Sequence, residues 1–369
     1  MMRKIKLKEL VSFNKGQQIN GNELLSEGRY DYLNGGINPS GKWNNYNVEG
    51  NTIAISEGGN SCGYVNYMNQ NFWCGAHCYY LFDIKCNVKY LFYNFKYNER
   101  SLQNIRSGAC MPNIKKKDLG DFEIFIDDDI NIQSKIVSYL DSISYIIQNR
   151  KKQIDLLDEL IKSQFVEMFG DIKLNNKGWH VIDKIGNVCV LNPKKSEIES
   201  IDNIEVSFIP MQNVSEKGYI NANEVRLLND VKKGFTYFRE NDILFAKITP
   251  CMENGKGAVA KGLKNNIGFG STEFHVIRPT DRVNSIWLYI YTTFKSFRSE
   301  AERKMTGSAG QKRVPIKFLD NYEIAIPPID LQNKFANFVK QADKMKIQIE
   351  NSLKQMEELY DSLMENYFG

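Results

Sequence analysis

Two stretches of the chain place apolar residues at alternating steps of four and three, which is the spacing of a coiled-coil seam. The first stretch runs from Ile136 to Met168 and the second from Phe335 to Tyr367, 199 positions later. The seam positions predicted to pack between the two helices are Ile136, Leu140, Ile143, Ile147, Ile154, Leu157, Ile161, Phe335, Val339, Ile349, Leu353, Met356 and Leu363. Both stretches are therefore predicted to be long helices.

Polar residues interrupt these seams in only three places. Arg150 and Gln164 break the first seam, and Lys346 alone breaks the second. Asn131 and Asp330 are predicted to cap the helix starts, because a side-chain oxygen there accepts from free backbone N–H groups. Each helix would contain about 38 residues and form a rod of about 57 Å. Two equal seams in one chain are expected to bury each other, and the chain between them could accommodate either direction; the pseudo-two-fold symmetry of the repeat favours an antiparallel coiled coil.

The similarity between the two stretches extends beyond the seams. "FVEMFG" at 165–170 is echoed by "MENYFG" at 364–369, and a shift of 200 aligns "LGDFEIFI" at 119–126 with "LDNYEIAI" at 319–326. A strand-like Glu-Ile-x-Ile and a Phe-Gly end at almost the same separation indicate an internal duplication. The pairing of the copies predicts pseudo-two-fold symmetry.

Two blocks of domain size remain outside the helices. The predicted order is a first domain at 1–128, a helix at 129–170, a second domain at 171–328 and a helix at 329–369. Short β-type runs separated by Gly/Asn turns occur in both domains. These runs are "NTIAIS", "CYYLFDI", "EVSFIPM", "DILFAKI" and "TEFHVIRP", and helical patches are predicted at 88–106 and 285–304. The predicted fold class is α+β, with two such domains and two long helices.

Composition supports a soluble protein of two or three domains. The 369 residues are enough to bury cores without disulfides, and the start "MMRKIKLKEL" lacks the apolar segment of a signal peptide. Seven scattered cysteines predict a reducing, cytoplasmic setting, and no apolar run is long enough to cross a bilayer. The net charge of +4 is too modest to identify a nucleic-acid-binding protein by itself.

Motifs for catalysis and for metal binding are weak. Gly255-Lys256 is followed by glycine, where a phosphate-binding loop needs Ser or Thr. Cys74, His77 and Cys78 are close together but alternate with aromatics, which favours buried free thiols over a zinc site. The three aspartates at 127–129 are more typical of a helix start than of a metal site. We expect no catalytic residue and no metal site.

Methyl transfer to a base amino group is also disfavoured. That chemistry uses an Asn/Asp-Pro-Pro-aromatic loop and a glycine-rich turn between a strand and a helix. The "IPPI" at 326–329 lacks the polar and aromatic residues, and "GFGST" at 268–272 leads into a strand-like run. A self-sufficient methyltransferase is therefore not expected.

The order of domain, helix, domain, helix resembles the specificity subunit (HsdS) of type I restriction–modification systems. The resemblance covers nearly the whole chain. It depends on the paired phrases "FEIFIDDDINIQSKI" and "YEIAIPPIDLQNKF", and on "ISEGGNSCGYVNY", "FWCGAHCY", "ILFAKITPCMENGKGA" and "GFGSTEFHVIRP" inside the domains. The chain departs from an even repeat where Asp127–Asp129 stand in place of Pro327-Pro328.

The resemblance implies two target-recognition domains that read an asymmetric, bipartite site on double-stranded DNA. It also implies that the helices dock two methyltransferase subunits, which carry S-adenosylmethionine and modify adenine. A restriction or translocase subunit, where one exists, would supply ATP and Mg²⁺. This chain itself would hold no cofactor.

Within these domains, polar residues on loops are the candidates for contacts to bases, and Lys or Arg near small-residue turns are the candidates for contacts to phosphates. In the first domain the candidates are Gln17, Gln18, Lys42, Trp43, Ser56, Asn60, Lys115 and Lys116. In the second domain they are Gln212, Asn213, Lys247, Thr249, Asn254, Lys256, Gln311, Lys312 and Arg313. An alternative from another class is a coiled-coil adaptor that assembles proteins and binds no DNA.

Overall fold

The structure is a computed structural model that describes residues 2–108, 112–198, 202–308 and 310–369. Two helices of 40 residues dominate it, α5 (Ile130–Phe169) and α11 (Ile329–Phe368). The chain divides into unit 1, residues 1–153 with 349–369, and unit 2, residues 154–348. Each unit therefore contains one end of each long helix together with one α+β domain.

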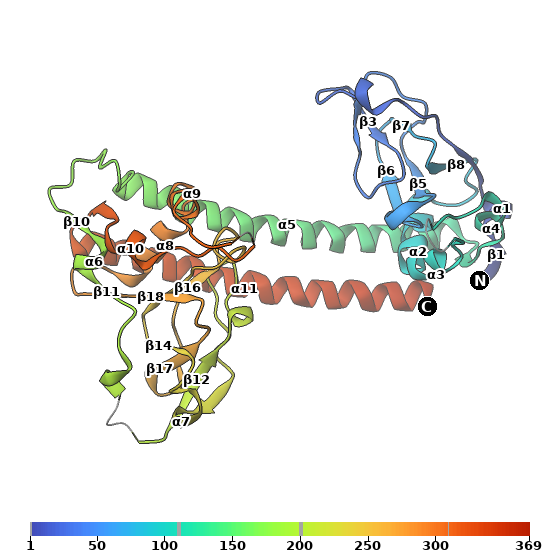
Figure 1. The fold of residues 1–369 in the computed structure, drawn as a ribbon. Helices are drawn as coiled ribbons and strands as arrows, with labels where there is room; N and C mark the ends of the chain where they lie inside the picture. The colour runs from blue at the N-terminus through green and yellow to red at the C-terminus, as the bar shows by residue number, and fades with distance from the viewer. Residues whose placement is uncertain (1, 109–111, 199–201, 309) are drawn as a thin grey trace. The chain divides into compact units, whose positions relative to one another are not determined.

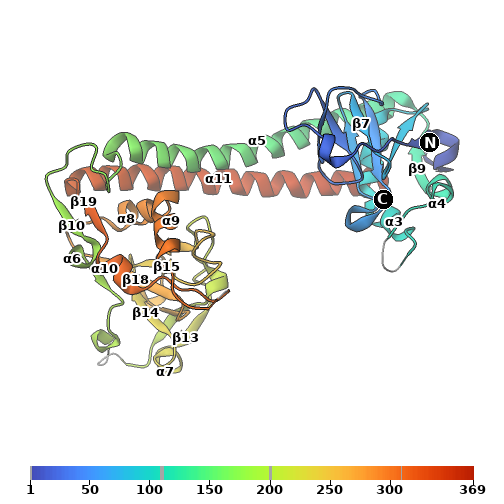
Figure 2. The same ribbon diagram turned by 45° about the horizontal axis from the view of Figure 1, so that its top comes forward.

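Within each unit the ends of α5 and α11 lie side by side and run in opposite directions (Figures 1 and 2). In unit 2 the Phe165 ring meets the Phe335 ring edge-on at 5.4 Å between centroids. In unit 1 Leu140 shares an apolar cluster with Met364 and Phe368. Residues late in α5 contact residues early in α11, and residues early in α5 contact residues late in α11. The pairing is therefore antiparallel, as the pseudo-two-fold symmetry of the repeat predicts.

The predicted seam residues all lie at least partly out of solvent. Seven are buried, namely Ile136, Leu140, Ile143, Ile154, Ile161, Phe335 and Val339. Six are half-buried, namely Ile147, Leu157, Ile349, Leu353, Met356 and Leu363. Their burial removes apolar surface from water on both helices at once, which stabilises the pair.

The predicted N-caps are each wrong by two residues. Helix α5 starts at Ile130, and the Asp129 carboxylate accepts from the Asn131 backbone N–H at 2.8 Å, so Asp129 and not Asn131 supplies the acceptor. Helix α11 starts at Ile329, and the Pro328 carbonyl accepts from the Leu331 N–H at 2.9 Å. The residues before each predicted cap already provide acceptors, so the helices begin earlier.

A buried glutamine at the start of each long helix joins that helix to a domain. Gln133 donates to the Asp127 carbonyl at 2.6 Å and accepts from the Asn87 N–H at 2.7 Å. Gln332 makes the equivalent pair of bonds, with Pro327 at 2.8 Å and Asn284 at 2.8 Å. Asn87 and Asn284 are the N-caps of the first helices of the two helical patches. The repeated glutamine thus fixes a helix of each domain against a long helix.

The domain of unit 1 contains a four-stranded sheet in the order β2-β8-β5-β6, a three-stranded sheet β4-β3-β7 and the pair β1-β9. The strands are β1 (Met2–Lys6), β2 (Ser12–Lys15), β3 (Tyr30–Leu33), β4 (Gly41–Trp43), β5 (Thr52–Ser56), β6 (Val65–Met68), β7 (Phe72–Cys74), β8 (Cys78–Phe82) and β9 (Glu123–Asp127). The helices are α1 (Leu7–Leu10), η1 (Gly21–Glu23), η2 (Gly59–Ser61), α2 (Val88–Tyr97), α3 (Glu99–Asn104) and α4 (Lys116–Asp121).

The domain of unit 2 contains sheets in the orders β11-β18-β15-β16 and β13-β12-β17-β14, and the pair β10-β19. The strands are β10 (Ile182–Lys184), β11 (Cys189–Leu191), β12 (Glu205–Ile209), β13 (Val225–Leu227), β14 (Thr236–Arg239), β15 (Ile243–Ala246), β16 (Gly257–Val259), β17 (Ile267–Gly270), β18 (Phe274–Pro279) and β19 (Glu323–Ala325). The helices are α6 (Ile185–Val188), η3 (Lys195–Ile198), η4 (Met211–Asn213), α7 (Leu228–Val231), η5 (Lys264–Asn266), α8 (Ser285–Thr292), α9 (Lys295–Arg303) and α10 (Ile316–Asp320).

The Glu-Ile-x-Ile phrase forms the closing strand of each domain. It pairs antiparallel with the opening strand, with Ile5 opposite Ile124 in unit 1 and Asp183 opposite Ile324 in unit 2. The five β-type runs of the sequence contain β5, β8, β12, β15 and β18, and each predicted helical patch holds two short helices. In the described part of the chain, none of the helices is both long and apolar enough to cross a membrane.

Candidate nucleic-acid interface

Each domain closes two distant loops against each other in the same way, and we call this contact the clasp. In unit 1 the clasp joins residues 57–58 to 113–114, with the Ile114 N–H donating to the Glu57 carbonyl at 2.9 Å. In unit 2 it joins residues 247–248 to 313–314, with the Val314 N–H donating to the Lys247 carbonyl at 2.9 Å. Residues 114 and 314 differ by 200, the shift at which the flanking sequences repeat.

The clasp of unit 2 and the adjoining η4 together hold the second domain's candidates. The Thr249 N–H donates to the Lys312 carbonyl at 3.0 Å, which places the segment after β15 against residues 311–313. The Lys256 ammonium lies 3.5 Å from the Met211 carbonyl, which brings the same segment to η4. Three segments that are far apart in sequence therefore meet. They carry all nine candidates: Gln212, Asn213, Lys247, Thr249, Asn254, Lys256, Gln311, Lys312 and Arg313.

Charge at this clasp is partly neutralised by a carboxylate. Arg313 donates to both oxygens of Glu273, with Nη2–Oε1 at 2.7 Å and Nε–Oε2 at 2.9 Å. The Arg313 guanidinium lowers the pKa of Glu273. Burial lowers the pKa of Lys247, which is half-buried in the same cluster. Among the site's four cations, namely Lys247, Lys256, Lys312 and Arg313, Lys312 is the exposed one and is the best placed to meet a phosphate.

A buried histidine, His275, contacts the backbone of the clasp of unit 2. His275 is 5% exposed, its Nε2 lies 2.8 Å from the Val314 carbonyl and its Nδ1 lies 3.4 Å from the Asn192 side-chain amide. A neutral imidazole satisfies both contacts, because Nε2 donates to the carbonyl while Nδ1 accepts from the amide. Burial lowers the pKa of His275, which keeps this neutral form.

This burial predicts a loss of stability in mild acid. Because the pKa of His275 is lower in the folded than in the unfolded state, its contribution is complete above the ordinary histidine value and is lost as the pH falls through the folded pKa. The slope for one proton is at most about 1.4 kcal/mol per pH unit. Urea unfolding measured at several values between pH 7.5 and 5.5 gives the free energy of unfolding at each pH. This free energy should fall less steeply with decreasing pH for H275Q than for the wild type. An equal dependence of the unfolding free energy on pH in the two proteins would contradict the prediction.

In unit 1, four of the candidates lie around the clasp. Asn60 is exposed on η2, Lys115 is exposed before α4, and the Lys116 ammonium donates to the Asn14 side-chain oxygen at 2.8 Å. The prediction for Ser56 is corrected. Its side chain is 1% exposed and its hydroxyl donates to the Gly35 carbonyl, because the residue is the last of a strand buried on both faces. Ser56 positions the loop and has no surface to offer a base.

The other four candidates of unit 1 lie at the three-stranded sheet. Lys42 and Trp43 lie on β4, where the Lys42 ammonium pairs with the Asp31 carboxylate of β3 at 2.9 Å. Gln17 and Gln18 are exposed on the loop after β2. The Trp73 indole of β7 donates to the Gln17 carbonyl at 2.7 Å, which ties that loop to the sheet. The candidates of unit 1 thus form two groups, one at the clasp and one at this sheet.

Four residues of these sites were not identified from the sequence. Glu57 is 5% exposed and pairs with Lys15, Asn113 makes the β-bridge of the first clasp, and Glu273 and His275 are described above. The signal that could have located Asn113 is the shift of 200, which aligns it with Arg313. No sequence signal identifies Glu57, Glu273 or His275, because their partners lie 39 or more residues away.

Known proteins support this architecture. The family model described as "Type I restriction modification DNA specificity domain" matches residues 2–158 and 176–358. The EcoAI specificity subunit of Escherichia coli, a type I restriction enzyme component, is 40% identical over 192 residues, which are 50% of this chain and 32% of that protein. The EcoEI specificity subunit of the same species is 37% identical over 194 residues, 51% of this chain and 32% of that protein.

These alignments span about a third of the length of those two relatives. The fold itself is shared over the whole chain with the crystal structure of a type I restriction–modification S subunit from M. genitalium. That match has a TM-score of 0.66 and 18% identity, and it covers 100% of this chain and 96% of the other. Because the family model covers both repeats, the chain belongs to the type I restriction–modification DNA specificity family.

Proposed function

We propose that this chain reads an asymmetric, bipartite target on double-stranded DNA, with one half-site for each domain. The observation that carries the proposal is the clasp, which has the same backbone geometry in both units but different side chains. Glu57 and Asn113 in unit 1 correspond to Lys247 and Arg313 in unit 2. The two domains share a backbone arrangement but carry different side chains at the clasp. Such a pair of domains suits a DNA target whose two halves differ in sequence.

The residues at these sites suit base and phosphate recognition. Asn and Gln side chains can form paired hydrogen bonds with adenine, and Lys or Arg can do so with guanine. Gln17 is exposed on the loop after β2 and Gln212 is exposed on η4, so both amides are accessible to bases. Lys115 is exposed at the clasp of unit 1 and Lys312 at the clasp of unit 2, where they supply the positive charge that phosphates require.

The long helices are proposed to dock two methyltransferase subunits. Tyr139 and Tyr145 on α5 are 57% and 67% exposed, and Met345 and Ile347 on α11 are 54% and 50% exposed. These exposed apolar side chains leave surface on both long helices for a partner protein to bury. The partners would bring S-adenosylmethionine and modify adenine, and a restriction subunit, where one exists, would bring ATP and Mg²⁺. The role of this chain would be to choose the site.

Co-expression of the chain with its methyltransferase, followed by mapping of methylated adenine across a genome, tests the proposal. The expected result is one motif made of two unlike half-sites separated by unspecified bases. Methylation with no sequence preference, or at a continuous palindrome, would overturn it. The methyltransferase expressed alone is the control, and it should leave the motif unmodified.

A further inference from the structure

Lys346 is a charged residue inside a helix seam. It is 2% exposed on α11, at the position where the first repeat has Ile147, 199 residues earlier. A buried ammonium is costly unless it is paired and hydrogen-bonded. An aliphatic residue would pack the seam without that cost. The presence of a lysine therefore calls for an explanation in its contacts.

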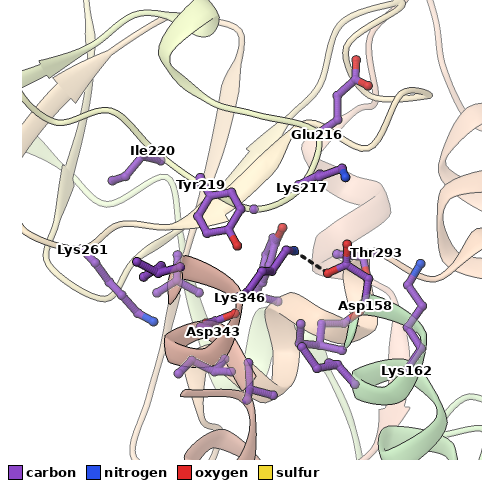
Figure 3. Close-up of a pocket in the computed structure, with 18 residues that line it drawn as sticks. Asp158, Lys162, Glu216, Lys217, Tyr219, Ile220, Lys261, Thr293, Asp343 and Lys346 are labelled. Atoms are coloured by element: carbon purple, nitrogen blue, oxygen red, sulfur yellow. Dashed lines mark hydrogen bonds and ion pairs between the residues drawn. The ribbon is translucent and has the colours of Figure 1, made fainter. Parts of the chain in front are cut away.

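The contacts of Lys346 lead out of the coiled coil to the recognition domain. Its ammonium donates to the Asp158 carboxylate of α5 at 2.6 Å, and it lies 5.1 Å from the centroid of the Tyr219 ring, within the range of a cation–π interaction. Figure 3 shows Lys346 directed at Asp158 with the ring of Tyr219 above it. Tyr219 belongs to neither helix. We call Lys346, Asp158 and Tyr219 the tip latch.

Tyr219 lies near the tip of a short hairpin, residues 213–221. The hairpin is closed by the Asn221 N–H, which donates to the Asn213 carbonyl at 2.9 Å, and by a β-bridge between Val214 and Ile220. The tip of the hairpin packs closely on α8. Gly218 has φ +89°, and a Cβ there would come within 2.6 Å of the Tyr289 hydroxyl of α8, so only glycine allows this approach.

The base of the same hairpin carries proposed base readers. It continues from η4, where Gln212 is exposed and Asn213 is half-buried. A closed hairpin of nine residues is short, so a displacement of its tip should be passed to its base. Tyr219 of the tip latch therefore lies near one end of the hairpin, and the proposed base-contacting residues Gln212 and Asn213 lie at the other end.

The tip packs on Tyr289 on one side and borders open space on another. A cavity of about 500 Å³ lies beside the latch, between the hairpin, α5, α8 and α11 (Figure 3). Asp343 also lines it, and burial raises the pKa of this carboxyl. Because the space next to the tip is not filled by side chains, the tip could move into it once the ammonium no longer holds Tyr219.

Unit 1 offers an internal comparison. Its equivalent positions are Ile147 and Glu357, and Glu357 pairs with Lys151 at 2.8 Å instead of with the seam. The matching hollow of unit 1 is lined by residues of α2, α5 and α11, among them Ser144 and Tyr360. Loop residues contribute to the lining in unit 2 and not, among the residues described, in unit 1.

We propose that Lys346 is a positioning residue for the second half-site. Through the tip latch it holds the 213–221 hairpin, and thereby Gln212 and Asn213, in the orientation that reads DNA. The inference rests on the proposed function of the chain. It adds a specificity determinant that lies in the coiled coil and makes no contact with DNA.

The test compares K346I, which installs the residue of the first repeat, with K346R, which keeps the cation. Each is assembled as full chain with its methyltransferase, and methylation rates are measured on DNA with one base changed in either half-site. For K346I, discrimination at the second half-site should fall at least tenfold, while discrimination at the first half-site and the melting temperature stay near wild type. K346R should retain most of the discrimination. Isoleucine suits the seam, and the half-exposed Asp158 remains solvated, so folding is preserved.

Y219L provides a second route, because it removes the cation–π contact and leaves both helices unchanged. It should also impair only the second half-site. K162A is the matched control, since Lys162 is an exposed lysine that lines the same cavity. It should behave as wild type.

The outcomes separate the latch from the proposed function. A wild-type complex with no discrimination at either half-site would overturn the proposed function itself. If the wild type discriminates but K346I and Y219L keep second-site discrimination within twofold, the latch is wrong. A parallel loss at both half-sites would also reject it, because the effect would then be general damage.

Discussion

Replacing Phe165 with alanine is expected to lower the free energy of unfolding of unit 2 by about 3 to 5 kcal/mol. The Phe165 side chain is 1% exposed. Its ring stacks on Trp287 and Tyr291 of α8, at 6.1 and 6.2 Å between centroids, and meets Phe335 of α11 at 5.4 Å. Truncation removes a ring that contacts both a domain helix and the opposite long helix, and the stiff aromatic neighbours cannot close the gap.

Urea unfolding followed by tryptophan fluorescence measures this effect, because Trp287 is fully buried next to the mutated ring. V166A is the matched control on the same helix. Val166 is 49% exposed, and its truncation should change stability by less than about 0.5 kcal/mol. A loss below about 1 kcal/mol for F165A would mean that the aromatic cluster does not join the domain to the helices.

Reversing two charges in the second domain should have the largest effect on DNA binding. The double variant K256E/K312E places two carboxylates on segments that we propose face the DNA backbone. Because each phosphate contact contributes a slope of about 0.9 to the salt dependence of binding, the slope should fall by about 2. The affinity near 100 mM salt should fall by about 100-fold. Filter binding of the assembled complex across a salt series measures both quantities.

The control is K340E/K344E, which reverses two exposed lysines of α11 and makes the same change in net charge. An equal loss in both variants would show a general charge effect and would reject the assignment of Lys256 and Lys312. Binding that is weak and insensitive to salt in the wild type would favour the alternative of a coiled-coil adaptor without DNA binding.

The long helices and the duplication could be predicted closely because their signals are local or repeated. Each apolar seam spans about nine helical turns and can be recognised from a short stretch of sequence. The shift of 199 to 200 residues appears in both the helices and the closing strands. The helix starts were less predictable. Asp129 and not Asn131 supplies the first acceptor, because neighbouring polar residues compete for the same role.

The sequence predicts which segments carry the candidate site better than it predicts which individual residues are exposed there. Thr249 and Lys312 were placed on loops, and the structure brings these loops together through the clasp. Ser56 is a candidate by sequence because a polar side chain on a loop can contact a base, but the burial of β5 on both faces encloses it. Such burial depends on which strands lie beside β5, and no local pattern reports that.

The sequence alone predicts the two helices, their antiparallel pairing and two domains with the same arrangement of elements. Each of these features depends on periodicity or on repetition along the chain. The partners of single charged residues do not follow from the sequence alone. Lys346 reads as a defect in a seam, and only the folded chain shows the Asp158 carboxylate and the Tyr219 ring, 188 and 127 residues away in sequence, that stabilise it there. Contacts between distant segments depend on packing, which the order of residues does not display.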